Sequence, residues 1–133
     1  VPYLEIVPHG SRRLKTASSK RVIPLVGEAL WAAQKVKSAD HSFCFPRYSN
    51  ETTCNSNSAS AAINKWLKTV IGNTYVIHGL RHSFRDRLRN VGANTDLIDQ
   101  LGGWSLKTVG QGYGDGYSLE FCGLWMGKLV LTL

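Results

Sequence analysis

The chain has 133 residues, of which 43% are hydrophobic, and it carries a formal net charge of +7 at pH 7. This composition suits one domain with a real core and excludes extensive disorder. The positive balance favours a polyanionic partner, either nucleic acid or an anionic membrane surface, although solubility alone is the simpler interpretation. The three cysteines form no Cys-x-x-Cys pair, which disfavours a disulfide framework and a structural zinc site and fits a reducing cytoplasm. We see no signal-peptide pattern, and the longest apolar stretches are too short to span a bilayer.

The first quarter of the chain predicts a pair of strands. Apolar and polar residues alternate over Tyr3–Val7, as in a half-buried strand, and Pro8–Ser11 carries a turn signal. A second strand region covers Leu14–Leu25 and is interrupted by the small polar stretch Ala17–Lys20. Pro24 indicates an edge strand or the end of a strand, because proline has no N–H to donate to a sheet.

Helical periodicity dominates the middle of the chain. Apolar residues on one side predict a helix over Glu28–Lys37, and a polar surface loop follows it. A second helix is expected to start at a cap formed by Ser58 or Ser60 and to run to about Val70. The clearest helix covers Gly79–Val91, with an apolar stripe beside a stripe of arginines.

Three shorter helices are expected in the last third. Asn94 or Thr95 caps the first, Asp96–Leu101, which stops at a glycine pair. A second covers Leu106 to about Tyr113, although its glycines weaken it. Ser118 caps the last one, which continues to about residue 130.

The densest cluster of functional side chains runs from His78 to Arg89. His78 and Arg81 lie three residues apart, where one helical face or the entry to a helix can present both. Arg81, Arg85 and Arg89 lie four apart and share one helical face. Taken alone, such a stripe is an ordinary solvated face, and His82 beside an aromatic residue is an ordinary packed histidine.

The same region also mimics a helix-turn-helix, because a second short helix follows the turn Val91–Asn94. That second helix carries Asp96 and Asp99. Acidic side chains match phosphates poorly, so this alternative is disfavoured.

Residues further along the chain favour a functional interpretation of this cluster. Leu101-Gly-Gly-Trp104 follows it, and Tyr113 lies nine residues after Trp104. This set resembles the signature of the tyrosine recombinase (phage integrase) family: His-x-x-Arg, then Leu-Gly-His or Leu-Gly-Trp, then a tyrosine nine residues on. Trp104 stands where most family members have histidine, and Gly103 is an extra small residue. The resemblance extends from Tyr3 to the last helix.

The resemblance implies a catalytic domain with an α+β fold, mainly helical, and a small antiparallel β-sheet or hairpin near the N-terminus. It implies a site-specific recombinase or integrase that cleaves and rejoins DNA through a 3′-phosphotyrosine intermediate, without a metal or another cofactor. The covalent link conserves the bond energy for religation. No Asp/Glu cluster or histidine pair in the chain has metal-ligand spacing, which agrees with metal-free chemistry.

The family roles carry over onto matching residues. Tyr113 becomes the nucleophile, and the spacing from Trp104 favours it over Tyr117. Arg81 offers a planar fork for two phosphate oxygens, and His78 and Trp104 add N–H donors. A phenol keeps its proton at neutral pH, so it needs a base, either His78 or a phosphate oxygen.

The hairpin near the N-terminus resembles the segment in which the family carries a lysine that acts as general acid. Lys15 matches that lysine best, and Lys20 is the second choice because the hairpin loop varies in length. Further basic residues expected to contact DNA are Lys20, Arg21, Arg85 and Arg89. We expect His78, Arg81 and Trp104 to converge on one concave basic surface, with Lys15 facing it.

One departure from the family pattern concerns its first arginine, which precedes the hairpin in an Ala-Arg-Ile-Ser-Glu-like segment. No residue before Arg12 matches that arginine. We therefore expect residues 1–133 to be a catalytic domain truncated at its N-terminus, without the first catalytic arginine and the core-binding domain, and inactive alone. The expected partners are double-stranded DNA and further protomers of a tetramer formed on DNA, with no membrane, in a bacterial or phage-encoded cytoplasmic protein.

Two other functions compete with this one. A non-catalytic DNA-binding module would have the same basic face but would never become covalently joined to DNA. A metal-dependent nuclease would need a carboxylate cluster, which the sequence lacks. The last helix, whose family counterpart packs on a neighbouring protomer, is expected to pack either within its own chain or on a partner.

Overall fold

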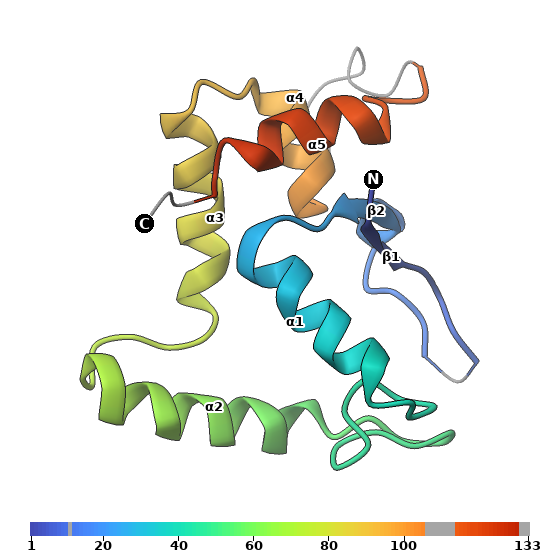
Figure 1. Cartoon of the computed structure of the whole chain (residues 1–133), viewed down its shortest axis with the longest axis vertical. Helices are drawn as coiled ribbons and strands as arrows, with labels where there is room; N and C mark the ends of the chain where they lie inside the picture. Colours follow the sequence, from blue (N-terminus) through green and yellow to red (C-terminus); the bar gives the residue numbers. More distant parts are fainter. Residues whose placement is uncertain (11, 106–113, 131–133) are drawn as a thin grey trace. The chain divides into compact units, whose positions relative to one another are not determined.

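The computed structural model describes residues 1–10, 12–105 and 114–130. The chain divides into two compact units: unit 1 contains Val1–Ala33 and Phe84–Leu133, and unit 2 contains Gln34–Ser83. Figure 1 labels the helices and strands. Helices α1 (Gly27–Ser38) and α3 (Gly79–Asn90) carry residues of both units, because the unit boundaries fall within them.

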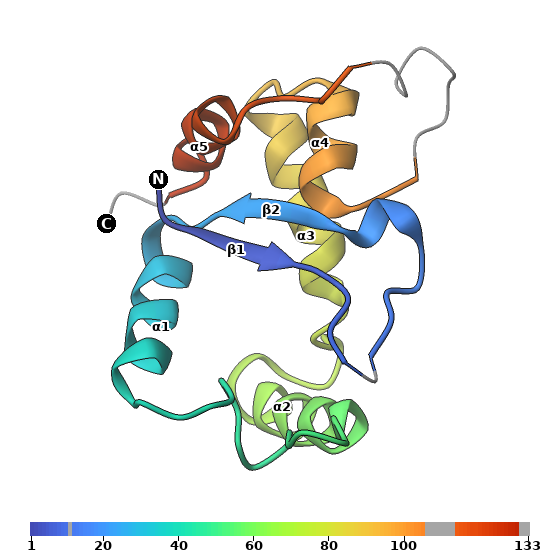
Figure 2. The ribbon, with the colours of Figure 1, turned by 90° about the vertical axis from the view of Figure 1, so that its right-hand side faces the viewer.

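Unit 1 begins with a two-stranded antiparallel sheet, shown in Figure 2. β1 (Tyr3–Ile6) pairs along its whole length with β2 (Arg21–Pro24). The sheet confirms the expected strand pair. The second strand is shorter than expected, because the polar stretch before it forms a 3-10 turn, Ala17–Ser19, instead of extended backbone.

Among the described residues of unit 1, two short helices follow α3, and each begins at a side-chain cap. α4 (Thr95–Gly102) begins after Asn94, whose side-chain oxygen accepts a hydrogen bond at 2.9 Å from an N–H of the first turn. α5 (Leu119–Gly127) begins after Ser118, whose hydroxyl accepts a similar bond at 3.2 Å. Both caps were expected from the sequence, although α5 ends earlier than predicted.

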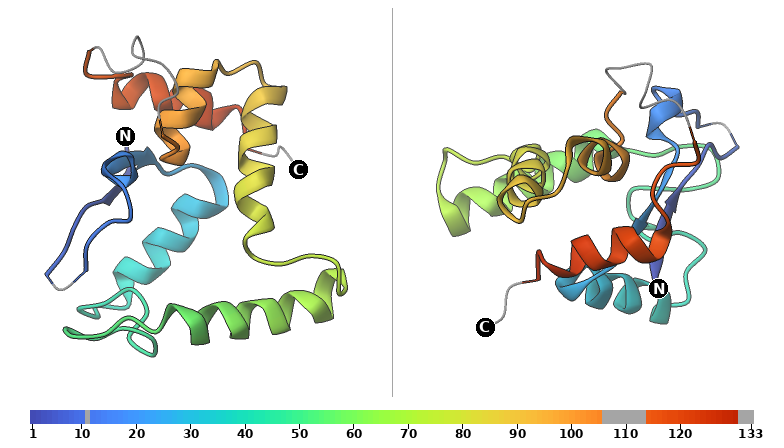
Figure 3. Two further views of the ribbon diagram at one scale, coloured as in Figure 1. Left: turned by 180° about the vertical axis from the view of Figure 1, so that it is seen from behind. Right: turned by 90° about the horizontal axis from the view of Figure 1, so that it is seen from above.

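The core of unit 1 joins α3, α4 and α5. Periodic apolar residues give α4 a buried face, and β2, which ends at the fully buried Pro24, packs against α4 and α5. Figure 3 gives two further views of α4 and α5, whose buried residues share this core. The buried apolar residues are Leu88, Leu97, Ile98, Leu101, Cys122 and Met126.

Unit 2 is built around α2 (Ser56–Ile71), the longest of the helices that the described residues form. Its cap is Asn55, whose side-chain oxygen accepts a hydrogen bond from the N–H of Ser58 at 3.1 Å. The expected cap at Ser58 or Ser60 was therefore wrong. The side chain of the asparagine accepts the first-turn N–H, so neither serine is the cap. Farther along α2, the Asn64 side chain accepts from the N–H of Ile77 at 2.7 Å and so holds the segment that leads into α3.

The fold class is confirmed as mainly helical with a small N-terminal antiparallel sheet. The helices expected at Glu28–Lys37, Gly79–Val91 and Asp96–Leu101 are present, and none of their ends differs from the expected one by more than one residue. The helix expected over Leu106–Tyr113 lies outside the described residues. In the part of the chain that the structure describes, no helix is both long and apolar enough to cross a membrane.

Candidate functional site

The sequence Leu101-Gly-Gly-Trp104 forms the C-terminal end of α4. Gly103 adopts a left-handed conformation with φ of 64°, and its N–H donates to the carbonyl oxygen of Gln100. The N–H of Trp104 donates to the carbonyl oxygen of Asp99 at 3.0 Å. This is the Schellman arrangement, which needs a residue that tolerates positive φ. Gly103, the extra residue of the motif, thus ends the helix and places Trp104 directly beyond it.

The indole ring of Trp104 is held on two sides. On one side it covers Gly102, where an added Cβ would overlap the ring. On the other side the guanidinium carbon of Arg85 lies 4.7 Å from the ring centroid, within cation–π range. The first glycine of the motif, Gly102, is therefore required by close packing, and the ring orientation depends on α3 as well as on α4.

Arg85 also forms an ion pair inside unit 1. Its Nη2 lies 3.2 Å from Oδ1 of Asp99, and the exposed fractions of the two side chains are 19% and 1%. Neither carboxylate oxygen of Asp99 accepts a hydrogen bond of regular geometry from a described residue, so Arg85 supplies its main electrostatic compensation. In the sequence, Asp99 is only one of two acidic residues of a short helix. Its burial could have been inferred from its position between Ile98 and Leu101, which belong to the buried face of α4.

This ion pair leads to a prediction about stability. Arg85→Ala leaves a buried carboxylate without its cation, and we expect it to lower the free energy of unfolding by about 3 kcal/mol. Asp99→Asn should cost less, because the partly exposed Arg85 can turn toward solvent. The matched control is Arg89→Ala, since Arg89 pairs at 3.4 Å with the exposed Asp86 and should contribute less than about 1 kcal/mol. Urea unfolding of the three variants measures these differences, and equal losses for Arg85→Ala and Arg89→Ala would contradict the assignment.

Arg21 attaches the hairpin to the same helix end. Its Nε donates to the carbonyl oxygen of Leu101 at 3.0 Å, and its Nη1 donates to that of Ser19 at 2.8 Å. The C-terminus of a helix carries partial negative charge, which favours a guanidinium there. The side chain lies so close to Gly103 that a Cβ at that glycine would overlap it. Arg21 thus joins β2 to the end of α4.

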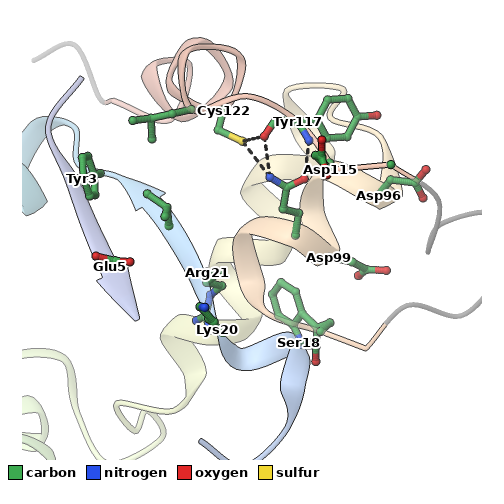
Figure 4. A pocket seen from close by; sticks show the side chains of 16 residues that line it. Tyr3, Glu5, Ser18, Lys20, Arg21, Asp96, Asp99, Asp115, Tyr117 and Cys122 are labelled. Carbon is green, nitrogen blue, oxygen red and sulfur yellow. Dashed lines mark hydrogen bonds between the residues drawn. The ribbon is translucent and has the colours of Figure 1, made fainter. Parts of the chain in front are cut away.

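A groove of about 920 Å³ opens beside these residues, between the hairpin, α4 and α5 (Figure 4). Lys20, Arg21 and Trp104, all expected site residues, line it. Its charged lining residues are Glu5, Lys20, Arg21, Asp96, Asp99 and Asp115. The groove in unit 1 is therefore mixed in charge rather than uniformly basic.

A buried thiol also lines the groove. Burial raises the pKa of the Cys122 thiol above its ordinary value, and a backbone hydrogen bond opposes this only in part. The sulfur lies 3.7 Å from Nε2 of Gln100. Because a thiolate is the reactive form of cysteine, Cys122 is a packing group and a poor nucleophile at neutral pH.

Tyr117, the alternative nucleophile, is held at several points. Its backbone N–H donates to Oε1 of Gln100 at 2.8 Å, and its carbonyl oxygen accepts from Nε2 of Gln100 at 2.9 Å. Its hydroxyl accepts a hydrogen bond from Nδ2 of Asn94 at 2.8 Å. The ring stacks on Phe121 with centroids 5.0 Å apart. Tyr113, the preferred nucleophile, lies outside the described residues.

His78 and Arg81 belong to unit 2, and both side chains are exposed. His78 precedes the first residue of α3, and its carbonyl oxygen accepts from the N–H of Arg81 at 3.1 Å. Its ring meets that of His82 edge to face, with centroids 5.8 Å apart. The expected placement of His78 and Arg81 at the entry to a helix is confirmed.

Among the expected site residues, the structure brings together Lys20, Arg21, Arg85 and Trp104 in unit 1. Lys15 and Arg89 are also in unit 1, where both are exposed and neither lines the groove. The convergence of His78 and Arg81 with Trp104 stays a prediction. Within the described ranges, no group of three or more histidine, cysteine or acidic residues is arranged to hold a metal ion.

Comparison with family models gives one match, to the phage integrase family, over residues 4–117. Comparisons with curated proteins and with solved structures gave no significant match. The match covers most of the chain, including all residues assigned to the site by the sequence. The chain therefore belongs to the phage integrase family, the tyrosine recombinases. Membership implies tyrosine recombinase activity on DNA.

Proposed function

We propose that this chain is the catalytic domain of a site-specific recombinase that cleaves and rejoins DNA through a 3′-phosphotyrosine link, without a metal ion. The proposal rests on the structure at the C-terminal end of α4, in a chain that belongs to this family. There Gly103, Gly102 and Arg85 fix the ring of Trp104. Tyr113 follows nine residues later, at the family spacing.

In the proposed reaction the phenolic oxygen of Tyr113 attacks the phosphorus of a phosphodiester. The bond to the 5′ oxygen breaks. The phosphate keeps its bond to the 3′ oxygen of the DNA and is now also bonded to the tyrosine. Lys15 gives a proton to the leaving oxygen, while His78 or a phosphate oxygen takes the phenolic proton. Arg81, together with the N–H donors of His78 and Trp104, stabilises the negative charge that grows on the phosphoryl oxygens. Attack by a free 5′ hydroxyl reverses these steps and rejoins DNA.

The basic residues divide into two proposed roles. Lys20 and Arg89 are exposed, which supports contact with the DNA backbone. Arg21 and Arg85 were expected to contact DNA as well, but each directs its guanidinium to partners inside unit 1. We assign these two arginines to holding the site, since their N–H groups are engaged in shaping the end of α4.

The proposed partner is double-stranded DNA, with four protomers assembled on it during synapsis, in a cytoplasmic setting. We further propose that activity requires a first arginine and a core-binding domain N-terminal to this chain. The reason is that the family's first catalytic arginine has no counterpart before Arg12.

A nicked suicide DNA substrate tests this function, with protein that includes the proposed first arginine. Loss of a short fragment after cleavage prevents rejoining, so a recombinase accumulates as a covalent protein–DNA complex. We expect this complex to form equally well with and without a metal chelator. Hydrolysis that needs metal would support a nuclease, and binding without a covalent complex would support a DNA-binding module; either result would overturn the proposal.

Binding of the isolated chain to duplex DNA should weaken steeply with salt. Each phosphate contact by lysine or arginine releases counterions, so log K falls against log salt with a slope of about −0.9 per contact. Affinity should be low and sequence preference small, because residues 1–133 are tested here without the core-binding domain that we propose. Arg89→Ala should reduce the slope by about one contact. Fluorescence anisotropy across a salt series measures this, and an affinity independent of salt would contradict the proposed interface.

A further inference from the structure

Gln100 of α4 binds the backbone of Tyr117 at two points. Its Oε1 accepts from the N–H at 2.8 Å, and its Nε2 donates to the carbonyl oxygen at 2.9 Å (Figure 4). A side-chain amide used in this way satisfies both backbone polar groups of one residue, as a neighbouring strand would. Gln100 is partly buried, and its amide nitrogen also lies against the sulfur of Cys122. The segment is thus fixed to α4 at Tyr117.

Gly116 permits this close approach. Its φ of 77° lies in the left-handed region, which favours glycine. A Cβ at this position would lie only 2.6 Å from Oε1 of Gln100. Any other residue would therefore strain the backbone and push it away from the amide.

Asn94 adds a third attachment, at the side chain of Tyr117. Its Nδ2 donates to the phenolic oxygen at 2.8 Å, while its Oδ1 caps α4 at the N–H of Leu97. The ring of Tyr117 stacks on Phe121 with an interplanar angle of 15°. Backbone, ring and hydroxyl of Tyr117 are all held, by α4 on one side and by α5 on the other.

Trp104 is attached to the same helix. Its backbone N–H donates to the carbonyl oxygen of Asp99, and its ring contacts Gly102 and the guanidinium of Arg85. Trp104 precedes Tyr113 in sequence by nine residues, and Tyr117 follows it by four. One short helix thus holds the chain on both sides of the proposed nucleophile.

We propose that Gln100 and Asn94 are positioning residues for the reaction: by fixing Tyr117 they anchor the chain four residues beyond Tyr113 and limit the space that the attacking phenol explores. This inference rests on the proposed function of Tyr113. The physical basis is that a tethered nucleophile gains effective concentration at its target as its freedom decreases. Tyr117 is then the anchor of the nucleophile segment and takes no part in the bond changes.

The test measures the rate of covalent attachment to a suicide DNA substrate, together with DNA affinity, in the protein that carries the first arginine. Gln100→Ala should slow attachment about tenfold, as expected for two lost hydrogen bonds, with DNA affinity within about twofold of the wild type. Asn94→Ser keeps a capping side chain but is too short to reach the phenol. It should slow attachment about threefold, as should Tyr117→Phe, and the double variant should be no slower than either, because both remove one interaction.

An external nucleophile separates positioning from general damage to the site. When Tyr113→Phe is combined with Gln100→Ala, a small nucleophile in solution, such as hydrogen peroxide, should cleave the DNA as fast as with Tyr113→Phe alone. Such a nucleophile needs no tether, so its rate reports only phosphate activation. If Gln100→Ala slows the peroxide reaction equally, or if it leaves attachment by Tyr113 unchanged, positioning by Gln100 is refuted. If the wild-type protein forms no covalent complex at all, it is instead the proposed function that fails.

Discussion

Tyr113→Phe is expected to abolish covalent attachment of DNA while leaving DNA affinity nearly unchanged. The substitution removes the oxygen that we propose attacks the phosphorus, and it removes none of the positive charge that binds phosphate. The measurement is a gel assay for the covalent complex on a suicide substrate, beside anisotropy with the same duplex. The protein used includes the proposed first arginine, which we expect the unsubstituted enzyme to need for activity.

Tyr117→Phe is the matched control for this experiment. It deletes the same atom from a tyrosine four residues away, and it should keep covalent attachment within about tenfold of the wild-type rate, because the lost oxygen makes one hydrogen bond, to Asn94. The reverse pattern, in which Tyr117→Phe eliminates the complex and Tyr113→Phe does not, would show that the spacing argument from Trp104 is wrong.

Arg81→Ala should slow cleavage by on the order of 10²-fold or more, the usual loss when one donor to a developing oxyanion is removed. It should also weaken DNA binding, since a cation at the phosphate is lost. Single-turnover rates at saturating DNA separate the two effects. Arg89→Ala, two turns along the same helix, is the control: it should weaken binding without slowing cleavage at saturation. Equal cleavage rates for Arg81→Ala and the wild type would remove Arg81 from the reaction.

The helices of this protein could be predicted well from local patterns, and their first residues less well. α3 and α4 were found because their apolar stripes are regular, and the capping role of Asn94 was one of two choices made from sequence. The start of α2 was missed because Asn55, Ser58 and Ser60 are all good capping residues within one short stretch. Only the backbone conformation decides among them, and it selects Asn55.

The roles of the arginines depended on contacts between helices. Arg81, Arg85 and Arg89 form one stripe in the sequence, with nothing to distinguish them. In the fold, Arg85 faces α4 and pairs with Asp99, while the ion pair of Arg89 among the described residues is with Asp86 on its own helix. Sequence periodicity gives the face of a helix but does not reveal which residue of that face meets a buried carboxylate on another helix.

The glycines of the site illustrate a similar limit. Gly103 looked like an insertion in a family motif, and its positive φ shows that it ends α4. Gly116 comes shortly after a helix that the sequence predicts to be weakened by its glycines, and its conformation and its closeness to Gln100 are what allow Tyr117 to dock. A glycine signals backbone freedom in a sequence, and its purpose depends on which group approaches it.

The most direct test of the proposed function is to locate the tyrosine that becomes joined to DNA. The covalent complex from a suicide substrate, formed in the presence of a chelator, is digested with a protease that cleaves before aspartate. Cleavage before Asp115 separates Tyr113 from Tyr117, so mass spectrometry of the nucleotide-bearing peptide distinguishes them without ambiguity. We expect the phosphodiester remnant on the peptide that ends at Gly114, attached to Tyr113. A remnant on the peptide that begins at Asp115, or DNA cut without any linked peptide, would contradict the assignment of Tyr113 as the nucleophile.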